Sequence, residues 1–353
     1  MSPAKADAEI TAPHPRETGV LFGHQDAEAA LLNAYKSGRI PHAWLLGGAQ
    51  GIGKATLAYR MARFVLTHRD PLSPAVQRAE TLAIDPHEPA ARHIAQNAHG
   101  SLLTLERTAN DKGVLRTVIT VDETRETISF FGSTAAVEGW RVCIVDTVDE
   151  LNPNAANALL KILEEPPQQS LFLLVSHAPA RVLPTILSRC RKLPMRPLAT
   201  EDVIRAAAHA ISRDARDTAL TEAAAASEGS VARALTLLGG DALKLQQRTA
   251  AMLAGLPKVD PREVHALGDS LPLSDRVALA AFIDGVERWI SERLRTDGTS
   301  NANLPRLARL AEVWEKIARA ARDTQDYNLE RKPLVFSVFS MLAEATRLAS
   351  SDR

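Results

Sequence analysis

The chain has 353 residues, of which 45% are hydrophobic and 24% are charged, an ordinary globular composition that argues against disorder. Its 42 basic residues balance 42 acidic residues, so it lacks the overall positive charge of a protein that grips nucleic acid alone. The sequence has no run of about 18 apolar residues and no signal-peptide pattern, and we therefore expect a cytoplasmic protein with no membrane partner. The length predicts two or three domains.

The two cysteines, Cys143 and Cys190, are too few for a disulfide framework or a four-thiolate zinc site. Four histidines share one stretch of the chain: His68, His87, His93 and His99. Their spacing does not match the i, i+3 or i+4 pairs with which helices bind zinc. We therefore predict no metal site.

The first third of the chain contains one clear strand, loop and helix pattern. Residues 1–16 are polar and contain three prolines, which predicts a disordered or loosely attached arm, with order beginning near Gly19. Residues 26–36 have the apolar spacing of an amphipathic helix. Residues 42–46 form a short apolar strand that leads into four glycines, and helical periodicity resumes over residues 54–66.

Four further apolar runs have the length of strands: residues 102–105, 118–121, 142–145 and 171–175. Helical patterns such as residues 122–131 and 154–163 lie between them, and this alternation predicts a parallel α/β sheet. Beyond Pro197 the pattern is helical only. We expect an α/β domain over residues 17–196, a small helical domain over 197–255 and a C-terminal helical domain over 256–353.

Residues 48–54 read Gly-Ala-Gln-Gly-Ile-Gly-Lys, the G-x-x-x-x-G-K part of a phosphate-binding P-loop. The backbone N–H groups of such a loop converge on phosphate oxygens at a helix N-terminus, and the lysine reaches the terminal phosphates. The candidate nucleotide-binding residues are Gly48, Gly51, Gly53 and Lys54. The alternative interpretation is a glycine turn that only caps a helix.

Two of the groups that ATP hydrolysis requires are missing. The residue after Lys54 should be Ser or Thr to bind magnesium, but it is Ala55, and Thr56 points about 100° away on a helix. The apolar strand 142–145 ends in Asp146, where P-loop proteins hold magnesium through a carboxylate. The glutamate that would activate water should follow Asp146, but this position is Thr147.

Three further segments carry a resemblance to a known family. They are Leu21-Phe22-Gly23-His24, the run Asn-Ala-Leu-Leu-Lys-Ile-Leu-Glu-Glu-Pro-Pro at residues 157–167, and Ile-Leu-Ser-Arg-Cys at residues 186–190. Together with the P-loop and Asp146, they resemble the delta-prime subunits of the bacterial replicative clamp loader, part of the DNA polymerase III holoenzyme. The resemblance spans about residues 18–240.

This resemblance implies an AAA+ α/β domain, a helical lid and a C-terminal collar through which five subunits form a ring. It implies a subunit that does not hydrolyse ATP but offers Arg189 as an arginine finger in trans to a neighbouring motor subunit. The implied partners are the motor and clamp-opening subunits, the sliding clamp, and primed DNA through the complex. No cofactor is required, and weak ATP or ADP binding is left open. The assembled holoenzyme is a DNA-directed DNA polymerase, a nucleotidyltransferase.

The chain departs from its relatives at several positions. Ala55 and Thr147 weigh against the motor subunit, and residues 67–100 lack the four-cysteine zinc module that many relatives carry. Ala232 stands where the motor subunit has an ATP-sensing arginine, and Arg233 is one place off.

Two alternatives remain. One is an active P-loop ATPase in which Thr56 and either Asp149 or Glu150 replace the missing groups, although a helix start or a solvated turn is the more ordinary role for this acidic pair. The other is a standalone DNA-binding module, which the zero net charge disfavours.

Overall fold

The computed structural model describes residues 12–108, 116, 118–132, 139–238, 241–273, 276–297, 304–327 and 329–351. The chain divides into two compact units, one over Thr11–Leu235 and the other containing Thr236–Arg353. None of the described helices is long and apolar enough to cross a membrane.

The first unit is built on a five-stranded parallel sheet with the strand order β2-β3-β4-β1-β5. The strands are β1 (Ala43–Gly47), β2 (Leu102–Glu106), β3 (Arg141–Asp146), β4 (Ser170–Ser176) and β5 (Arg191–Pro194). Because all neighbouring strands are parallel, the C-terminal ends of β1 and β3 lie on the same side of the sheet. This arrangement confirms the predicted α/β class.

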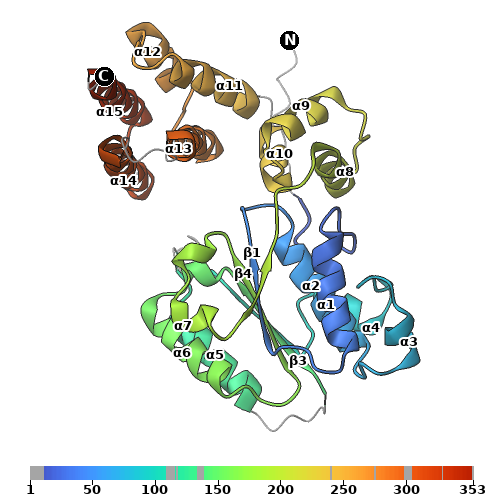
Figure 1. Ribbon diagram of the computed structural model, residues 1–353. Coiled ribbons are helices and arrows are strands. Elements are labelled where there is room, and N and C mark those ends of the chain that lie inside the picture. The colour runs from blue at the N-terminus through green and yellow to red at the C-terminus, as the bar shows by residue number, and fades with distance from the viewer. Residues whose placement is uncertain are drawn as a thin grey trace. The chain divides into compact units, whose positions relative to one another are not determined.

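Helices cover both faces of the sheet (Figure 1). Successive side chains of a strand point to opposite faces, so Trp44 and Leu46 pack in one apolar cluster, while Ala43 and Leu45 pack in another. The first cluster includes α1 (Gln25–Lys36) and α2 (Lys54–Thr67), and the second includes α5 (Val121–Gly132) and α6 (Pro153–Glu164). The core is therefore a three-layer sandwich.

One predicted strand does not form, and one strand was not predicted. Residues 118–121 make only an isolated bridge through Ile119, because α5 begins at Val121, directly after Thr120. The Glu123 carboxylate accepts hydrogen bonds from the Thr120 N–H at 2.6 Å and from its hydroxyl at 2.9 Å, a helix-start contact that outweighs the β propensity of the valines. The missed strand β5 lies at the sheet edge, where its charged residues and its terminal proline are tolerated.

Residues 12–22 form a segment that we call the N-terminal strap. Arg63 of α2 donates hydrogen bonds to the carbonyls of Thr18 at 2.9 Å, of Pro15 at 3.3 Å and of Arg16. Residues 12–16 of the predicted loose arm are therefore attached to α2, ahead of Gly19. The rest of that arm lies outside the described residues.

Short helices fill the connections of the first unit: α3 (Pro74–Arg78), α4 (Pro89–Ala95), the 3₁₀ turns Val148–Glu150 and Pro179–Arg181, and α7 (Pro184–Leu187). Three helices follow the sheet: α8 (Thr200–Ile211), α9 (Thr218–Ala226) and α10 (Val231–Leu237). The second unit contains α11 (Asp241–Ala254), α12 (Pro261–Asp269), α13 (Arg276–Asp297), α14 (Leu304–Asp326) and α15 (Arg331–Ser351).

The expected domain boundary at residue 255 lies one helix beyond the division between the two compact units. Leu245 and Leu253 of α11 are buried in the same apolar cluster as Phe282 and Val286 of α13. Helix α11 therefore shares the core of the C-terminal helices. The three-domain division itself stays a prediction.

A buried ion pair connects α1 with α2. Glu28 and Arg60 are each less than 10% exposed, and one Glu28 carboxylate oxygen accepts hydrogen bonds from Arg60 Nη2 at 2.5 Å and Nε at 3.1 Å. The same oxygen accepts the N–H of Leu82 at 3.0 Å, and Arg60 also donates to the carbonyl of Gly19 in the strap. One carboxylate thus organises two helices, a loop and the strap.

We expect Glu28→Ala to lower the free energy of unfolding by about 3 kcal/mol, because it leaves a buried guanidinium without its counterion. The matched control is Asp26→Ala, which removes an exposed carboxylate from the first turn of the same helix and should cost less than about 1 kcal/mol. Urea unfolding of both variants measures the difference. Equal losses would contradict the organising role of Glu28.

Candidate functional site

The glycine loop connects the end of β1 to the start of α2, as the sequence predicts. Gly51 and Gly53 have φ values of 75° and 100°, in the left-handed region that glycine enters without steric cost. At Gly48, a Cβ atom would collide with the carbonyl oxygen of Met195. The three glycines therefore have steric roles in the shape of this loop.

Lys54, the first residue of α2, is turned into the loop. Its side chain is buried, and Nζ donates hydrogen bonds to the carbonyl of Gly48 at 2.8 Å and to that of Ala49. Burial lowers the pKa of Lys54 to about 8, although the carboxylates of Asp146 and Asp149 oppose the shift. The ammonium thus holds the loop in place at the position from which a P-loop lysine reaches phosphate.

Asp146 ends β3 beside this loop, and the last residue of β2, Glu106, is its register partner. Burial raises the pKa of Asp146, and repulsion from Glu106 adds to the shift, while Lys54 and Arg107 oppose it. The next residue, Thr147, is buried, and its hydroxyl has no hydrogen-bond partner among the described residues. A threonine hydroxyl cannot act as the carboxylate base at this position.

The acidic residues farther along have partners of their own. Asp149 accepts hydrogen bonds from the Ser176 hydroxyl at 2.8 Å, the His177 N–H at 2.5 Å and the Ala178 N–H at 3.4 Å. Glu150 forms an ion pair with Arg107 at 2.9 Å. These contacts fix the end of β4 and the end of β2, and they occupy both of the carboxylates of which the active-ATPase alternative requires one.

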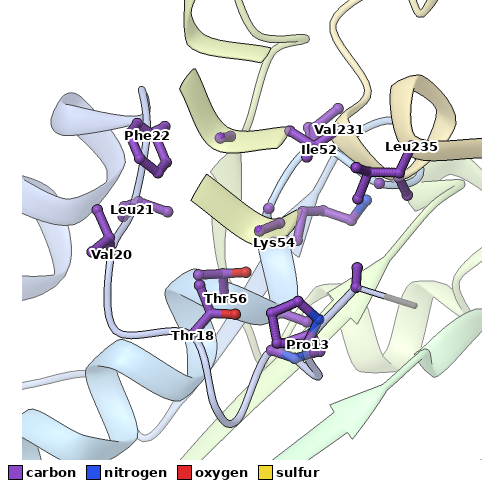
Figure 2. Close-up of a pocket in the computed structure, with 18 of the residues that line it drawn as sticks. Pro13, Thr18, Val20, Leu21, Phe22, Ile52, Lys54, Thr56, Val231 and Leu235 are labelled. Atoms are coloured by element: carbon purple, nitrogen blue, oxygen red, sulfur yellow. The ribbon is translucent and has the colours of Figure 1, made fainter. Parts of the chain in front are cut away.

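A cavity of about 680 Å³ lies over the loop, within the size range of small-molecule sites (Figure 2). Its walls come from three places: the N-terminal strap, the glycine loop with the ends of β3 and β4, and helices α8 and α10. Lys54, Asp146 and His177 line it, as do Ala55 and Thr56. The predicted nucleotide-binding groups Gly51, Gly53, Lys54 and Asp146 therefore meet at one cavity, and Gly48 shapes its loop.

The residues of the cavity suit a nucleotide better than they suit magnesium. The loop conformation, the buried lysine and the cavity volume suit the phosphates of a nucleotide. Ala55 has no side-chain oxygen with which to bind magnesium. Thr56 lines the cavity, but a helix turns about 100° per residue, so its hydroxyl takes a different direction.

The helical part of this unit is hydrogen-bonded to the loop itself. The carbonyl of Gly51 accepts the N–H of Val231 at 2.9 Å and that of Ala232 at 3.4 Å, at the start of α10. Ala232 lines the cavity, whereas Nη1 of Arg233 lies 3.7 Å from a Glu228 carboxylate oxygen. This helix thus presents no cation to the cavity from position 232.

Two histidines of the site were not predicted. His24 donates through Nε2 to the carbonyl of Ile52 at 2.7 Å and so fixes the outside of the loop. His177 lines the cavity, and its buried Nδ1 has no partner among the described residues. Burial lowers the pKa of His177 to about 4, and Lys54 adds to the shift. His24 belongs to the Leu21-Phe22-Gly23-His24 segment that carries the family resemblance, but no site role was assigned to it. His177 follows a strand pattern as a lone histidine and has no sequence signal.

Arg189 lies near the N-terminal ends of the strands, whereas the cavity lies at their C-terminal ends. It precedes β5, and in the register of β5 with β1 Arg191 is opposite Trp44, while Pro194 is opposite Gly47. The three residue steps from Trp44 to Gly47 span about 10 Å, and the loop begins only beyond them. The guanidinium of Arg189 is one-third exposed and pairs with Glu164 at 2.6 Å.

The predicted absence of a metal site rests on the cysteines and histidines. Both cysteines are free thiols, and the described residues contain no group of three potential ligands. His93 and His99 have ring centres 6.4 Å apart in an edge contact.

The pH dependence of stability tests the burial of Lys54. Between pH 8 and 10 Lys54 has lost its proton in the folded chain. In the unfolded chain, where its pKa is near 10.5, Lys54 still carries that proton. The contribution of Lys54 to the free energy of unfolding therefore rises with pH. Relative to Lys54→Met, the free energy of unfolding of the unsubstituted chain should gain about 2 kcal/mol from pH 7 to pH 10. Urea unfolding at several pH values measures this gain, and a constant difference would contradict it.

By sequence, the chain is similar to subunits of DNA polymerase III. A family model described as "DNA polymerase III, delta subunit" matches residues 23–199, half of the chain. Among curated relatives, the DNA polymerase III subunit delta' of Pseudomonas aeruginosa is 38% identical over 149 residues, which are 42% of this chain and 41% of that protein. The DNA polymerase III subunit tau of Escherichia coli is 28% identical over 250 residues, which are 69% of this chain and 36% of that protein.

These alignments span about two fifths or less of the relatives' own lengths. Among solved structures, a DNA polymerase III gamma subunit-related protein from Thermotoga maritima aligns over 89% of this chain and 99% of its own, with 15% identity and a TM-score of 0.40. The family match covers the glycine loop, Asp146 and Arg189 alike. This chain belongs to the DNA polymerase III delta subunit family, whose members are clamp loader subunits of the AAA+ superfamily.

Proposed function

We propose that this chain is the delta-prime-type subunit of a clamp loader. In this role it does not hydrolyse ATP, and it supplies Arg189 in trans to the ATP site of a neighbouring motor subunit. Its partners are the motor and clamp-opening subunits of a five-membered ring, and through the ring the sliding clamp and primed DNA. The chain works in the cytoplasm as part of the DNA polymerase holoenzyme.

The observation that carries this proposal is the composition of the cavity. It keeps a loop, a lysine and an aspartate, but it has Ala55 and Thr147 where hydrolysis needs a magnesium-binding hydroxyl and a carboxylate. Asp149 and Glu150 are already engaged by β4 and by Arg107. A cavity of this kind supports weak ATP or ADP binding without turnover.

The location of Arg189 supports action in trans. Arg189 precedes a strand and the cavity follows the strands, so the two lie at opposite ends of the strands of one sheet. This arginine therefore has no access to its own glycine loop. A partly exposed guanidinium at a domain edge suits contact with another subunit's phosphates, since its planar fork pairs two oxygens and neutralises charge that develops in phosphoryl transfer.

The active-ATPase alternative has one observation in its favour, the presence of Thr56 in the cavity lining. It still lacks an available base, because both nearby carboxylates are held in other contacts. The curated relatives include both delta' and tau/gamma subunits, so the proposal rests on the site and not on their names.

The isolated protein should show no DNA-stimulated ATP hydrolysis, because Ala55 cannot bind magnesium and Thr147 cannot activate water. Phosphate release from ATP with and without primed DNA measures this directly. Turnover above background that disappears in Lys54→Ala would contradict the proposal and establish the active-ATPase alternative.

In a reconstituted complex, Arg189→Ala should lower the motor subunit's ATP turnover on the order of 10³-fold, while gel filtration shows intact assembly. Arg189→Lys should also fail, because one ammonium cannot reproduce the bidentate fork. Lys54→Ala, and Arg216→Ala at an exposed loop arginine, should have little effect. An assembled Arg189→Ala complex with unchanged turnover would overturn the finger role.

A further inference from the structure

The guanidinium of Arg189 is held on one side by its own domain. Its Nη1 donates hydrogen bonds to the carbonyl of Thr185 at 2.8 Å and to the hydroxyl of Ser188 at 3.2 Å. Its Nη2 donates to Oε1 of Glu164 at 2.6 Å. Two of these contacts are local, but the carboxylate comes from 25 residues earlier in the chain.

Two helix ends bring these groups together. Helix α6 ends at Glu164, just before Glu165 and the two prolines that cannot continue it. Helix α7 spans Pro184–Leu187, and Ser188 is its C-cap. Helix α6 precedes β4 and helix α7 precedes β5, so both helix ends lie near the N-terminal ends of these strands. The length of α6 therefore determines where the Glu164 carboxylate lies relative to Arg189.

We propose that Glu164 is a positioning residue for Arg189, an inference that rests on the proposed function. It fixes the guanidinium before the neighbouring subunit's phosphate arrives. Arginine has a long side chain with much rotamer freedom, and an exposed arginine loses that freedom when it binds. The contact with Glu164 restricts this freedom in advance, so the finger meets the transferred phosphoryl group in one orientation.

The contact geometry favours positioning over blocking. A guanidinium has five N–H groups, and the three contacts use one each. Nε has no partner among the described residues, so two N–H groups, Nε–H included, remain for a phosphate. A phosphate needs two donors for bidentate pairing, and it can therefore bind while Glu164 stays in contact.

The site also permits a clean substitution. The Glu164 side chain is half exposed and the Arg189 side chain is one-third exposed, so removal of the carboxylate opens no cavity in the core. An exposed ion pair adds little to the stability of the fold. A loss of turnover in a Glu164 variant therefore reports on the finger and not on folding.

The experiment uses the full chain in a reconstituted complex with the motor and clamp-opening subunits, with primed DNA and ATP. We expect Glu164→Ala to lower kcat for ATP about tenfold or more, with KM for ATP within about twofold, since orientation matters most in the transition state. Glu164→Gln should keep most of the rate, because its amide oxygen still accepts the Nη2 hydrogen bond. The matched control is Glu165→Ala, which removes the neighbouring exposed carboxylate and should change neither constant.

Arg189→Ala and the double variant Glu164→Ala/Arg189→Ala distinguish a failure of the positioning role of Glu164 from a failure of the finger role of Arg189. If Glu164 acts through Arg189, the double variant should be no slower than Arg189→Ala alone. A slow Arg189→Ala complex with a Glu164→Ala complex at the unsubstituted rate would overturn the positioning role and leave the proposed function standing. A faster Glu164→Ala complex would also overturn it, by showing that the carboxylate restrains the finger. An unchanged rate in Arg189→Ala would overturn both.

Discussion

The parallel direction of all five strands is the constraint on which the rest of this molecule depends. Because the strands share one direction, every loop that follows a strand lies at the C-terminal ends of the strands. Every segment that precedes a strand lies at their N-terminal ends. The glycine loop and Asp146 follow β1 and β3, whereas Arg189 precedes β5. The strand direction thus separates a nucleotide-type cavity from the arginine that we assign to a neighbour's site.

Contacts within the chain hold the cavity in shape, although it has Ala55 and Thr147 where ATP hydrolysis needs a hydroxyl and a carboxylate. Its walls depend on contacts that involve no nucleotide: Arg60 and Arg63 of α2 hold the strap by its carbonyls, and His24 holds the outside of the loop. The buried Lys54 is bonded to the loop's own carbonyls. The shape of the cavity therefore depends on these internal hydrogen bonds and not on the side chains at positions 55 and 147.

The sequence predicts the parts of this structure that have a strong local pattern. The G-x-x-x-x-G-K loop, the apolar strands before it and before Asp146, and the helices around them were all predicted and are confirmed. The sequence failed where tertiary contacts decide. Strand β5 is short and charged, and only its place beside β1 makes it a strand, while Thr120 and Glu123 turn an apparent strand into a helix start. The strap, the partners of Asp149 and the pairing of Glu164 with Arg189 all join residues far apart in the chain.

The hydrogen bonds from the start of α10 to Gly51 have a mechanical consequence. A carbonyl oxygen of the glycine loop serves as the attachment point of a helix in the neighbouring wall, so loop and helix cannot move independently while the bonds hold. Any rotation of α8, α9 and α10 that widens the cavity must either break these bonds or pull the loop along. The backbone at Gly51 is therefore a mechanical joint, through which a displacement of α10 is transmitted to the glycine loop and a displacement of the loop to α10.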